Sequence, residues 1–214
     1  MLLSGFDMDD LLFRVIAFLI AITVHELGHA FVAYRLGDPT PKREGRITLN
    51  PVAHMDLLGT LMILFGPFGW AKPVSFNPYN FRGNKRVGKI LTTVAGPLAN
   101  FITAIIFCFL LVFFFNLGIE DEVWTGFVIR LVEAVVSLNL ILGLFNLVPI
   151  PPLDGYWIVR DLLPQRLALK LHPVEKYGPF VLLLAVVFGF TSVVILPIYY
   201  RLGDLLLGMV EALL

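Results

Sequence analysis

The apolar run at residues 11–36 constrains the fold most, because it is long enough to cross a membrane yet carries His25, Glu26 and His29. As a helix of about 26 residues it would be roughly 39 Å long, enough to span a bilayer with tilt or overhang. Ionisable side chains deep in a membrane helix are costly, so they are rare and usually functional. The run therefore predicts a membrane-spanning helix that carries a functional site.

These three residues form the pattern H-E-x-x-H. Residues at i and i+4 share one face of a helix, so the imidazoles of His25 and His29 can reach one metal ion. The carboxylate of Glu26 can take a proton from an activated water and return it to a leaving group. The pattern also arises by chance in soluble helices, but an unpaired cluster would hinder membrane insertion. We therefore predict one Zn²⁺ per chain, with His25 and His29 as ligands and Glu26 as the catalytic base.

The composition of the chain is that of a polytopic membrane protein. Of its 214 residues 58% are hydrophobic and only 15% are charged, and the mean hydropathy is +0.85. This length suits a single integral-membrane domain over residues 1–214. The apolar composition makes the lipid bilayer an expected partner. The formal net charge is zero, so nucleic acid is not expected as a partner. The sequence carries no signal for an oligomeric state.

Four apolar runs are long enough to be full transmembrane helices. They cover residues 11–36, 90–117, 127–147 and 180–200. Proline residues at positions 149, 151 and 152 end the third run, and the fourth is expected to bend or end near Pro197. A further apolar segment at 202–214 is too short to cross alone. The expected fold is thus an all-α membrane bundle with about four full spans and a short C-terminal apolar segment.

The stretch at residues 47–76 does not fit a spanning helix. Its apolar part, residues 57–65, is far too short to cross, and glycine and proline interrupt its surroundings. Alternation of polar and apolar residues at 45–49 is typical of a short strand. We predict a re-entrant or interfacial element here, such as a small sheet or β-hairpin. Irregular backbone at membrane depth is tolerated only against protein or a water-filled cavity, so this element indicates a hydrated cleft.

Lysine and arginine residues predict the orientation of the bundle. Most of them fall in two segments, residues 37–89 and 160–176, whereas the N-terminus and residues 120–122 are acidic. Both basic segments are therefore expected on the cytoplasmic side, with residues 120–122 outside. Because His29 lies about 10 Å from the end of its helix that faces this side, the site is expected toward the cytoplasm.

A catalytic zinc site needs a third protein ligand. Asp154 is the leading candidate, since it follows the third apolar run at its cytoplasmic end, in a proline-broken stretch that can fold back. A simple alternative is that Asp154 caps the helix after it. Competing ligands are His54 and Asp56, although His54 is more readily explained as lining the cleft. His172 is expected to be a surface residue.

Two motifs together resemble those of the site-2 protease family of intramembrane zinc metalloproteases. The first is the H-E-L-G-H motif at residues 25–29, and the second is N-L-V-P-I-P-P-L-D-G at residues 146–155. Segments 96–100 (G-P-L-A-N) and 69–74 (G-W-A-K-P-V) are similar to recurrent segments of that family. The resemblance runs from the first helix to about Arg160. Many relatives carry a PDZ or a CBS domain and this sequence shows neither, so it resembles a minimal member of the family.

The resemblance implies that His25, His29 and Asp154 bind zinc and that Glu26 is the general base. It also implies cleft positions for Asn146 and Asn100, where an amide can help to hold an oxyanion. Each asparagine has a plainer explanation, because membrane asparagines often only join helices by hydrogen bonds. For Asn100 this explanation is the stronger one.

The expected function is therefore that of an intramembrane zinc endopeptidase in a bacterial or archaeal cell membrane. Its substrate would be a transmembrane protein, unwound locally and paired as an extended strand with the element at 47–76. A zinc transporter is one alternative, but it would need several metal sites along a path. A relative that binds membrane helices without cutting them is the other, and the intact Glu26 argues against it.

Overall fold

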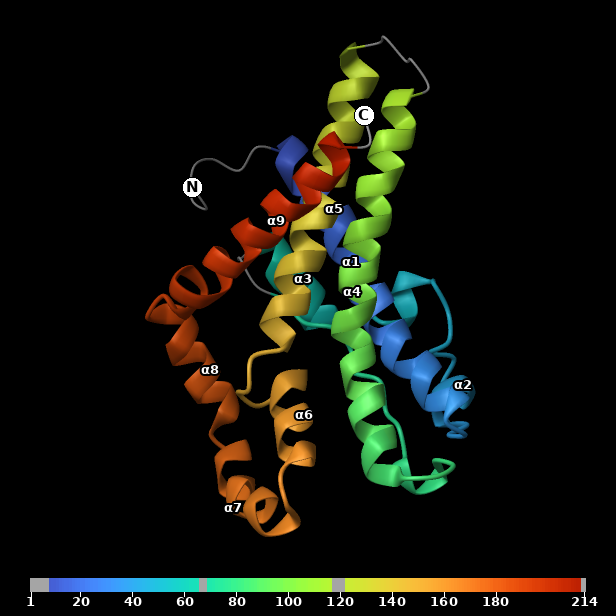
Figure 1. The fold of residues 1–214 in the computed structure, drawn as a ribbon, viewed down its shortest axis with the longest axis vertical. Coiled ribbons are helices and arrows are strands. Elements are labelled where there is room, and N and C mark those ends of the chain that lie inside the picture. Colours follow the sequence, from blue (N-terminus) through green and yellow to red (C-terminus); the bar gives the residue numbers. More distant parts are fainter. Residues whose placement is uncertain (1–7, 66–68, 117–121, 213–214) are drawn as a thin grey trace.

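The computed structural model describes residues 8–65, 69–116 and 122–212, which are almost entirely helical. The α-helices in chain order are α1 (Met8–Arg35), α2 (Thr40–Arg43), α3 (Leu57–Phe65), α4 (Lys85–Asn116), α5 (Glu122–Asn146), α6 (Asp154–Leu162), α7 (Gln165–Glu175), α8 (Gly178–Val187) and α9 (Leu196–Glu211) (Figure 1). Glu120 and Asp121, two of the three residues of the predicted acidic loop, lie outside the described residues.

Three long helices, α1, α4 and α5, form the centre of the molecule and pack against one another. Each is long and apolar enough to cross a membrane, which confirms three of the predicted spans. Gly28 allows α1 to approach α4 closely, because a Cβ atom there would lie 2.5 Å from the carbonyl oxygen of Ala95. Small residues at helix contacts are the usual means of tight packing in membranes.

The fourth predicted span is not a continuous helix. Helix α8 ends at Val187, and the next helical stretch, Thr191–Leu206, is bent from it by 73°. Gly189 supplies the break with a φ of +84°. Pro197 lies in the first turn of α9, where a helix tolerates proline, and α9 continues to Glu211. This span was expected to bend or end near Pro197, but the break lies at Gly189 instead, and the described part of the expected separate tail at 202–214 belongs to α9.

The β-hairpin predicted within residues 47–76 is not confirmed. Within the described part of this stretch, α3 and turns take its place, and the β pairing is a single bridge between Met55 and Ala71. Gly45 turns the chain with a φ of +68°, and the polar and apolar residues that follow it form bends instead of the predicted strand at 45–49.

Several of the shorter helices lie at one end of the bundle. Helix α2, the start of α4, and α6 and α7 all lie at the lower end in Figure 1, away from the end of α4 and the start of α5. Asp38, which follows α1, is fully buried and accepts hydrogen bonds from the Asn77 backbone N–H (2.6 Å) and the Asn80 side chain (2.8 Å). These bonds hold the non-helical segment 69–77 against α1.

Candidate metal centre

Two helices bring His25, His29 and Asp154 together. The histidines lie one turn apart on α1, and Asp154 is the first residue of α6. The Nε2 atoms of His25 and His29 are 3.1 Å apart. The Oδ2 atom of Asp154 is 3.2 Å from each of them. Both histidines are buried and the aspartate is nearly so, so the three ligand atoms face one another away from bulk solvent.

This arrangement fits a tetrahedral zinc ion. Bonds of 2.0–2.2 Å from zinc to nitrogen or oxygen place neighbouring ligand atoms about 3.3–3.5 Å apart, close to the separations observed. Oδ2 of Asp154 is buried and has no hydrogen-bond partner, so it is available to a cation. Two imidazole nitrogens and a carboxylate are also the donor set of many catalytic zinc sites, which keep the fourth position open.

Hydrogen bonds fix the orientation of both imidazole rings. Nδ1 of His25 donates to Oδ1 of Asn100 (2.7 Å), and Nδ1 of His29 donates to the carbonyl of Thr92 (2.8 Å). With Nδ1 protonated in each ring, the Nε2 lone pairs point at the shared centre. Metal-binding histidines are commonly held in this way, so α4 supplies the outer support of the site.

A buried amide chain holds Asn100 itself. Its Nδ2 donates to the carbonyl of Ala21 and to Oδ1 of Asn139, both at 2.9 Å. Asn139 on α5 then donates to the carbonyl of Val135 (2.8 Å). The structure therefore places Asn100 behind His25, where it joins α4 to α1 and α5 by hydrogen bonds. This arrangement corresponds to the plainer of the two explanations given for a membrane asparagine. The sequence reasoning missed Asn139, although a lone asparagine in an apolar run was a usable signal.

Gly96 makes room for the cluster on α4. A Cβ atom at this position would lie 2.3 Å from Nε2 of His29 and 2.8 Å from Cε1 of His25. These distances are too short for any side chain, so only glycine lets α4 face the two imidazoles here.

The fold-back after α5 aims Asp154 at α1. Helix α5 ends at Asn146, before the proline-rich stretch 147–153, and α6 begins directly at Asp154. Gly155 is essential to this turn, because a Cβ atom there would lie 2.1 Å from the carbonyl oxygen of Leu147. Helix α6 is then tied to α4, where Lys89 pairs with Asp161 at 3.1 Å.

Glu26 lies beside the histidines and is held from two sides. Its Oε2 atom accepts a hydrogen bond from the backbone N–H of Val74 (2.8 Å) and lies 3.7 Å from Nη2 of Arg46. Glu26 and Arg46 are both buried. Neither partner was anticipated, because a backbone N–H has no sequence signal and Arg46 looked like one more basic loop residue.

The other sequence candidates lie outside the cluster. His54 is fully buried and donates from Nε2 to the carbonyl of Thr48 (2.9 Å). Burial lowers the pKa of His54, and Arg46 lowers it further, against the raising effects of the Thr48 carbonyl and of Glu26. Asp56 accepts a hydrogen bond from the Gly59 backbone and caps α3.

Asn146 and His172 are also engaged elsewhere. Nδ2 of Asn146 donates to the carbonyl of Leu142 within its own helix (3.0 Å). His172 is exposed, as predicted, and pairs with Glu175 at 3.1 Å. In the described part of the chain, His25, His29 and Asp154 are the group of residues arranged to hold a metal.

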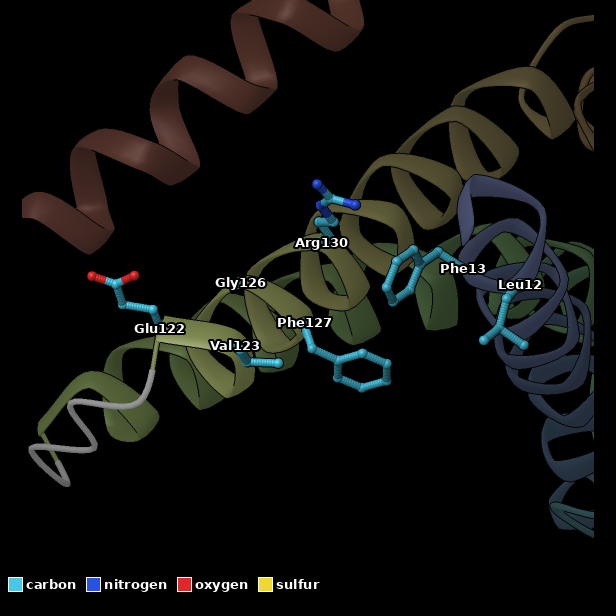
Figure 2. A pocket seen from close by; sticks show the side chains of 7 residues that line it. All are labelled: Leu12, Phe13, Glu122, Val123, Gly126, Phe127 and Arg130. Carbon is cyan, nitrogen blue, oxygen red and sulfur yellow. The ribbon is translucent and has the colours of Figure 1, made fainter. Parts of the chain in front are cut away.

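A cavity of about 380 Å³ lies far from this centre, between the starts of α1 and α5 (Figure 2). It is lined by Leu12, Phe13, Glu122, Val123, Gly126, Phe127 and Arg130. The twelve residues from Phe13 to His25 correspond to about 18 Å along α1. This cavity is therefore separate from the metal centre.

Comparisons with known proteins agree with the geometry. Residues 13–191 match the family described as Peptidase family M50. Long apolar helices and this match define a multi-pass membrane protein of the metallopeptidase class. The chain belongs to peptidase family M50, the site-2 protease family, which confirms the resemblance drawn from its two motifs.

Several relatives carry names that state zinc metalloprotease activity. "Putative zinc metalloprotease YwhC" of Bacillus subtilis (strain 168) is 40% identical over 202 residues, which are 94% of this chain and 92% of that protein. "Putative zinc metalloprotease Rip2" of Mycolicibacterium smegmatis is 30% identical over 169 residues, 77% of this chain and 62% of that protein. "Zinc metalloprotease MJ0392" of Methanocaldococcus jannaschii is 28% identical over 91% of this chain and 49% of its own. No solved structure gives a significant match.

Proposed function

We propose that this chain is an intramembrane zinc endopeptidase that hydrolyses peptide bonds within or near transmembrane segments of other proteins. One Zn²⁺ binds to His25, His29 and Asp154, and Glu26 is the general base. The observation that carries this proposal is the convergence of two Nε2 atoms and one carboxylate oxygen at 3.1–3.2 Å, between helices apolar enough to span a membrane.

The residues around the metal divide the chemical work. A bound zinc ion supplies Lewis-acid chemistry and makes water a nucleophile near neutral pH. Glu26 accepts the proton of the attacking water and returns it to the leaving amine. Asn100 and the Thr92 carbonyl keep both imidazole rings oriented throughout, since each holds the Nδ1 proton of one histidine.

Segment 69–77 is the proposed place for the substrate backbone. The N–H of Lys72 donates to the carbonyl of His54 (2.9 Å), and the N–H of Val74 donates to the carboxylate of Glu26. These alternate residues therefore turn their polar groups to the side of the segment that faces His54 and Glu26. In an extended segment the neighbouring residues Ala71, Pro73 and Ser75 point their polar groups the other way, and of these Pro73 offers only its carbonyl because it has no N–H. An unwound substrate strand pairs with that free edge by β-augmentation, directly beside the base.

The active site is proposed to face the cytoplasm of a bacterial or archaeal cell. The two basic segments include α2, the start of α4 and α7, which lie at the same end of the bundle as α6, the helix that carries Asp154 (Figure 1). Basic segments stay on the cytoplasmic side. An oxyanion role for Asn146 or His54 has less support, because both side chains bond to backbone carbonyls away from the cluster.

Cleavage in vesicles tests this function. The zinc-loaded chain is reconstituted with a synthetic transmembrane peptide of about 20 apolar residues flanked by lysines. Mass spectrometry is expected to find cuts within or next to the apolar stretch, lost with a zinc chelator and restored by added zinc. An intact peptide in the presence of zinc-loaded chain contradicts the proposal. Zinc flux into the same vesicles without cleavage would instead identify a transporter.

A further inference from the structure

We propose that Arg46 is a positioning residue for Glu26. Its guanidinium joins the carboxylate of the base to the backbone of segment 69–77, so that the base and a bound substrate strand meet at a fixed offset. This inference rests on the proposed function, and extends it to a residue in the loop between α1 and α3.

The burial of Arg46 requires an explanation first. Only 2% of the residue is exposed, although Arg43, three residues earlier at the end of α2, is exposed. A buried charge is costly unless it is paired and hydrogen-bonded. Within the described residues, the ion pair of Arg46 is the one with Glu26, at 3.7 Å from Nη2 to Oε2. The loop therefore delivers one positive charge to the base.

The hydrogen bonds of Arg46 tie three segments together. Nη1 donates to the carbonyl of Ala53, and Nη2 donates to the carbonyl of Lys72. A guanidinium is planar and presents its donors in a rigid fork, so these bonds fix the plane of the group. The position of its charge relative to Glu26 is then fixed as well.

The contacts with segment 69–77 set its register against the base. Arg46 holds the carbonyl of Lys72, and Glu26 holds the N–H of Val74 two residues later. Groups two residues apart point to the same side of an extended segment. A slip of the segment by one residue would break both contacts together, so the pair of residues specifies one register.

The two carboxylate oxygens of Glu26 have different surroundings, which supports a role in catalysis. Both the Val74 N–H and Arg46 approach Oε2. For the part of the chain that the structure describes, no hydrogen bond from the protein to Oε1 is present. One oxygen is thus held by the scaffold while the other is left for the proton of the attacking water.

Kinetics of Arg46→Gln test the inference, with Arg43→Gln, at the exposed end of α2 three residues earlier, as the control. Zinc-loaded, full-length variants are compared on the same transmembrane peptide. We expect kcat of Arg46→Gln to fall at least about tenfold, because a general base contributes 10²- to 10⁴-fold only when it is well placed. Arg46→Lys keeps the positive charge but loses the planar guanidinium, so its kcat is expected to lie between those of the parent and Arg46→Gln. Unchanged kcat in Arg46→Gln, whatever happens to KM, overturns the proposal, since a residue that merely supports the loop would alter KM or stability.

A double-mutant cycle supplies a readout that does not need activity. Thermal unfolding is measured for the parent, Arg46→Gln, Glu26→Gln and the double variant, each with its zinc content. Because either single change leaves a buried charge without its partner, the loss in the double variant is expected to be clearly smaller than the sum of the single losses. Additive losses would show that Arg46 does not act through Glu26. The cycle measures the coupling between Arg46 and Glu26 even if the parent chain cleaves no peptide. Absence of cleavage would contradict the proposed function, whereas additive losses would contradict the inference about Arg46.

Discussion

At the scale of single residues, the metal centre depends on the missing side chain of Gly96 as much as on the ligands themselves. Gly96 faces the two imidazoles with no side chain, at a distance where a Cβ atom would touch Nε2 of His29. Asp154 supplies the third ligand atom from another helix. Each of these features is a single position, so single substitutions report on it.

Gly96→Ala is expected to weaken zinc binding by at least about tenfold, an effect in the range seen for residues that orient metal ligands. The added methyl group would lie 2.3 Å from Nε2 of His29 and must displace that ring. Gly126→Ala on α5 is the control, because a Cβ atom there meets nothing within 4 Å. Zinc titration of both variants measures the effect. Equal affinities would show that His29 does not hold the metal through Nε2.

The ligand set itself is tested by removing each member. His25→Ala, His29→Ala and Asp154→Ala are each expected to lose most of the zinc, because two remaining protein ligands rarely retain it. Asp56→Ala is expected to keep the metal, since Asp56 only caps α3. Elemental analysis of the purified variants provides the measurement. Loss of zinc from the Asp56 variant with retention in the Asp154 variant would reverse the assignment.

At the scale of elements, short segments position the site more than the long helices do. Helix α6 carries Asp154, and segment 69–77 brings Val74 to Glu26. The segment is anchored by Asp38 through hydrogen bonds with Asn77 and Asn80. The Asp38 contacts therefore hold the segment that contacts Glu26, at a distance from the metal ligands.

Asp38 also predicts a pH dependence of stability. Burial alone would raise the pKa of its carboxyl, but hydrogen bonds from Asn80, Asn77 and Thr40 outweigh it and lower the pKa below the usual 3.8. Because the folded pKa is the lower one, the stabilisation is complete above the unfolded pKa and is lost as the pH falls through the folded pKa. Asp38→Asn is expected to cost about 1–3 kcal/mol at pH 7.

Thermal unfolding of the parent and Asp38→Asn at several pH values checks this expectation. The difference in Tm should be largest near neutrality and should shrink once the pH falls below about 4. Asp204→Asn, at an exposed position on α9, is the control and should not change Tm. A difference that stays constant down to the lowest pH would mean that the charge of Asp38 contributes nothing.

At the scale of the whole molecule, α2, the start of α4, α6 and α7 lie toward one end of an apolar bundle (Figure 1). Positively charged loops remain on the cytoplasmic side of a membrane. The account therefore places Lys85 and Arg166 on that side, and Glu122 at the start of α5 on the other.

Cysteine labelling in intact cells tests this topology. Cys108 is first replaced by alanine, and Lys85→Cys, Arg166→Cys or Glu122→Cys is then introduced alone. A membrane-impermeant thiol reagent is expected to label the Glu122 position in intact cells and the other two only after the membrane is opened. Labelling of the Lys85 position from outside would require α3 to cross the membrane, which contradicts the re-entrant interpretation.

The sequence allowed the central helices and the candidate ligands to be predicted because side-chain chemistry carries those signals. Apolar length marks α1, α4 and α5, and spacing marks His25 and His29. The contribution of Thr92 could not be found, since it acts through a carbonyl that every residue possesses. The bend of the fourth span was expected at Pro197 and not at Gly189, because a proline is the stronger signal in sequence, whereas the φ of +84° at Gly189 appears only in the fold.

The most direct test of the account is Glu26→Gln in zinc-loaded chain. The amide has nearly the shape of the carboxylate but cannot accept the proton of the attacking water. We expect the variant to keep its fold and its zinc while cleavage of the transmembrane peptide falls by at least about 100-fold. Cleavage at near-parental rate, with zinc bound, would show that Glu26 is not the base and would contradict the central claim.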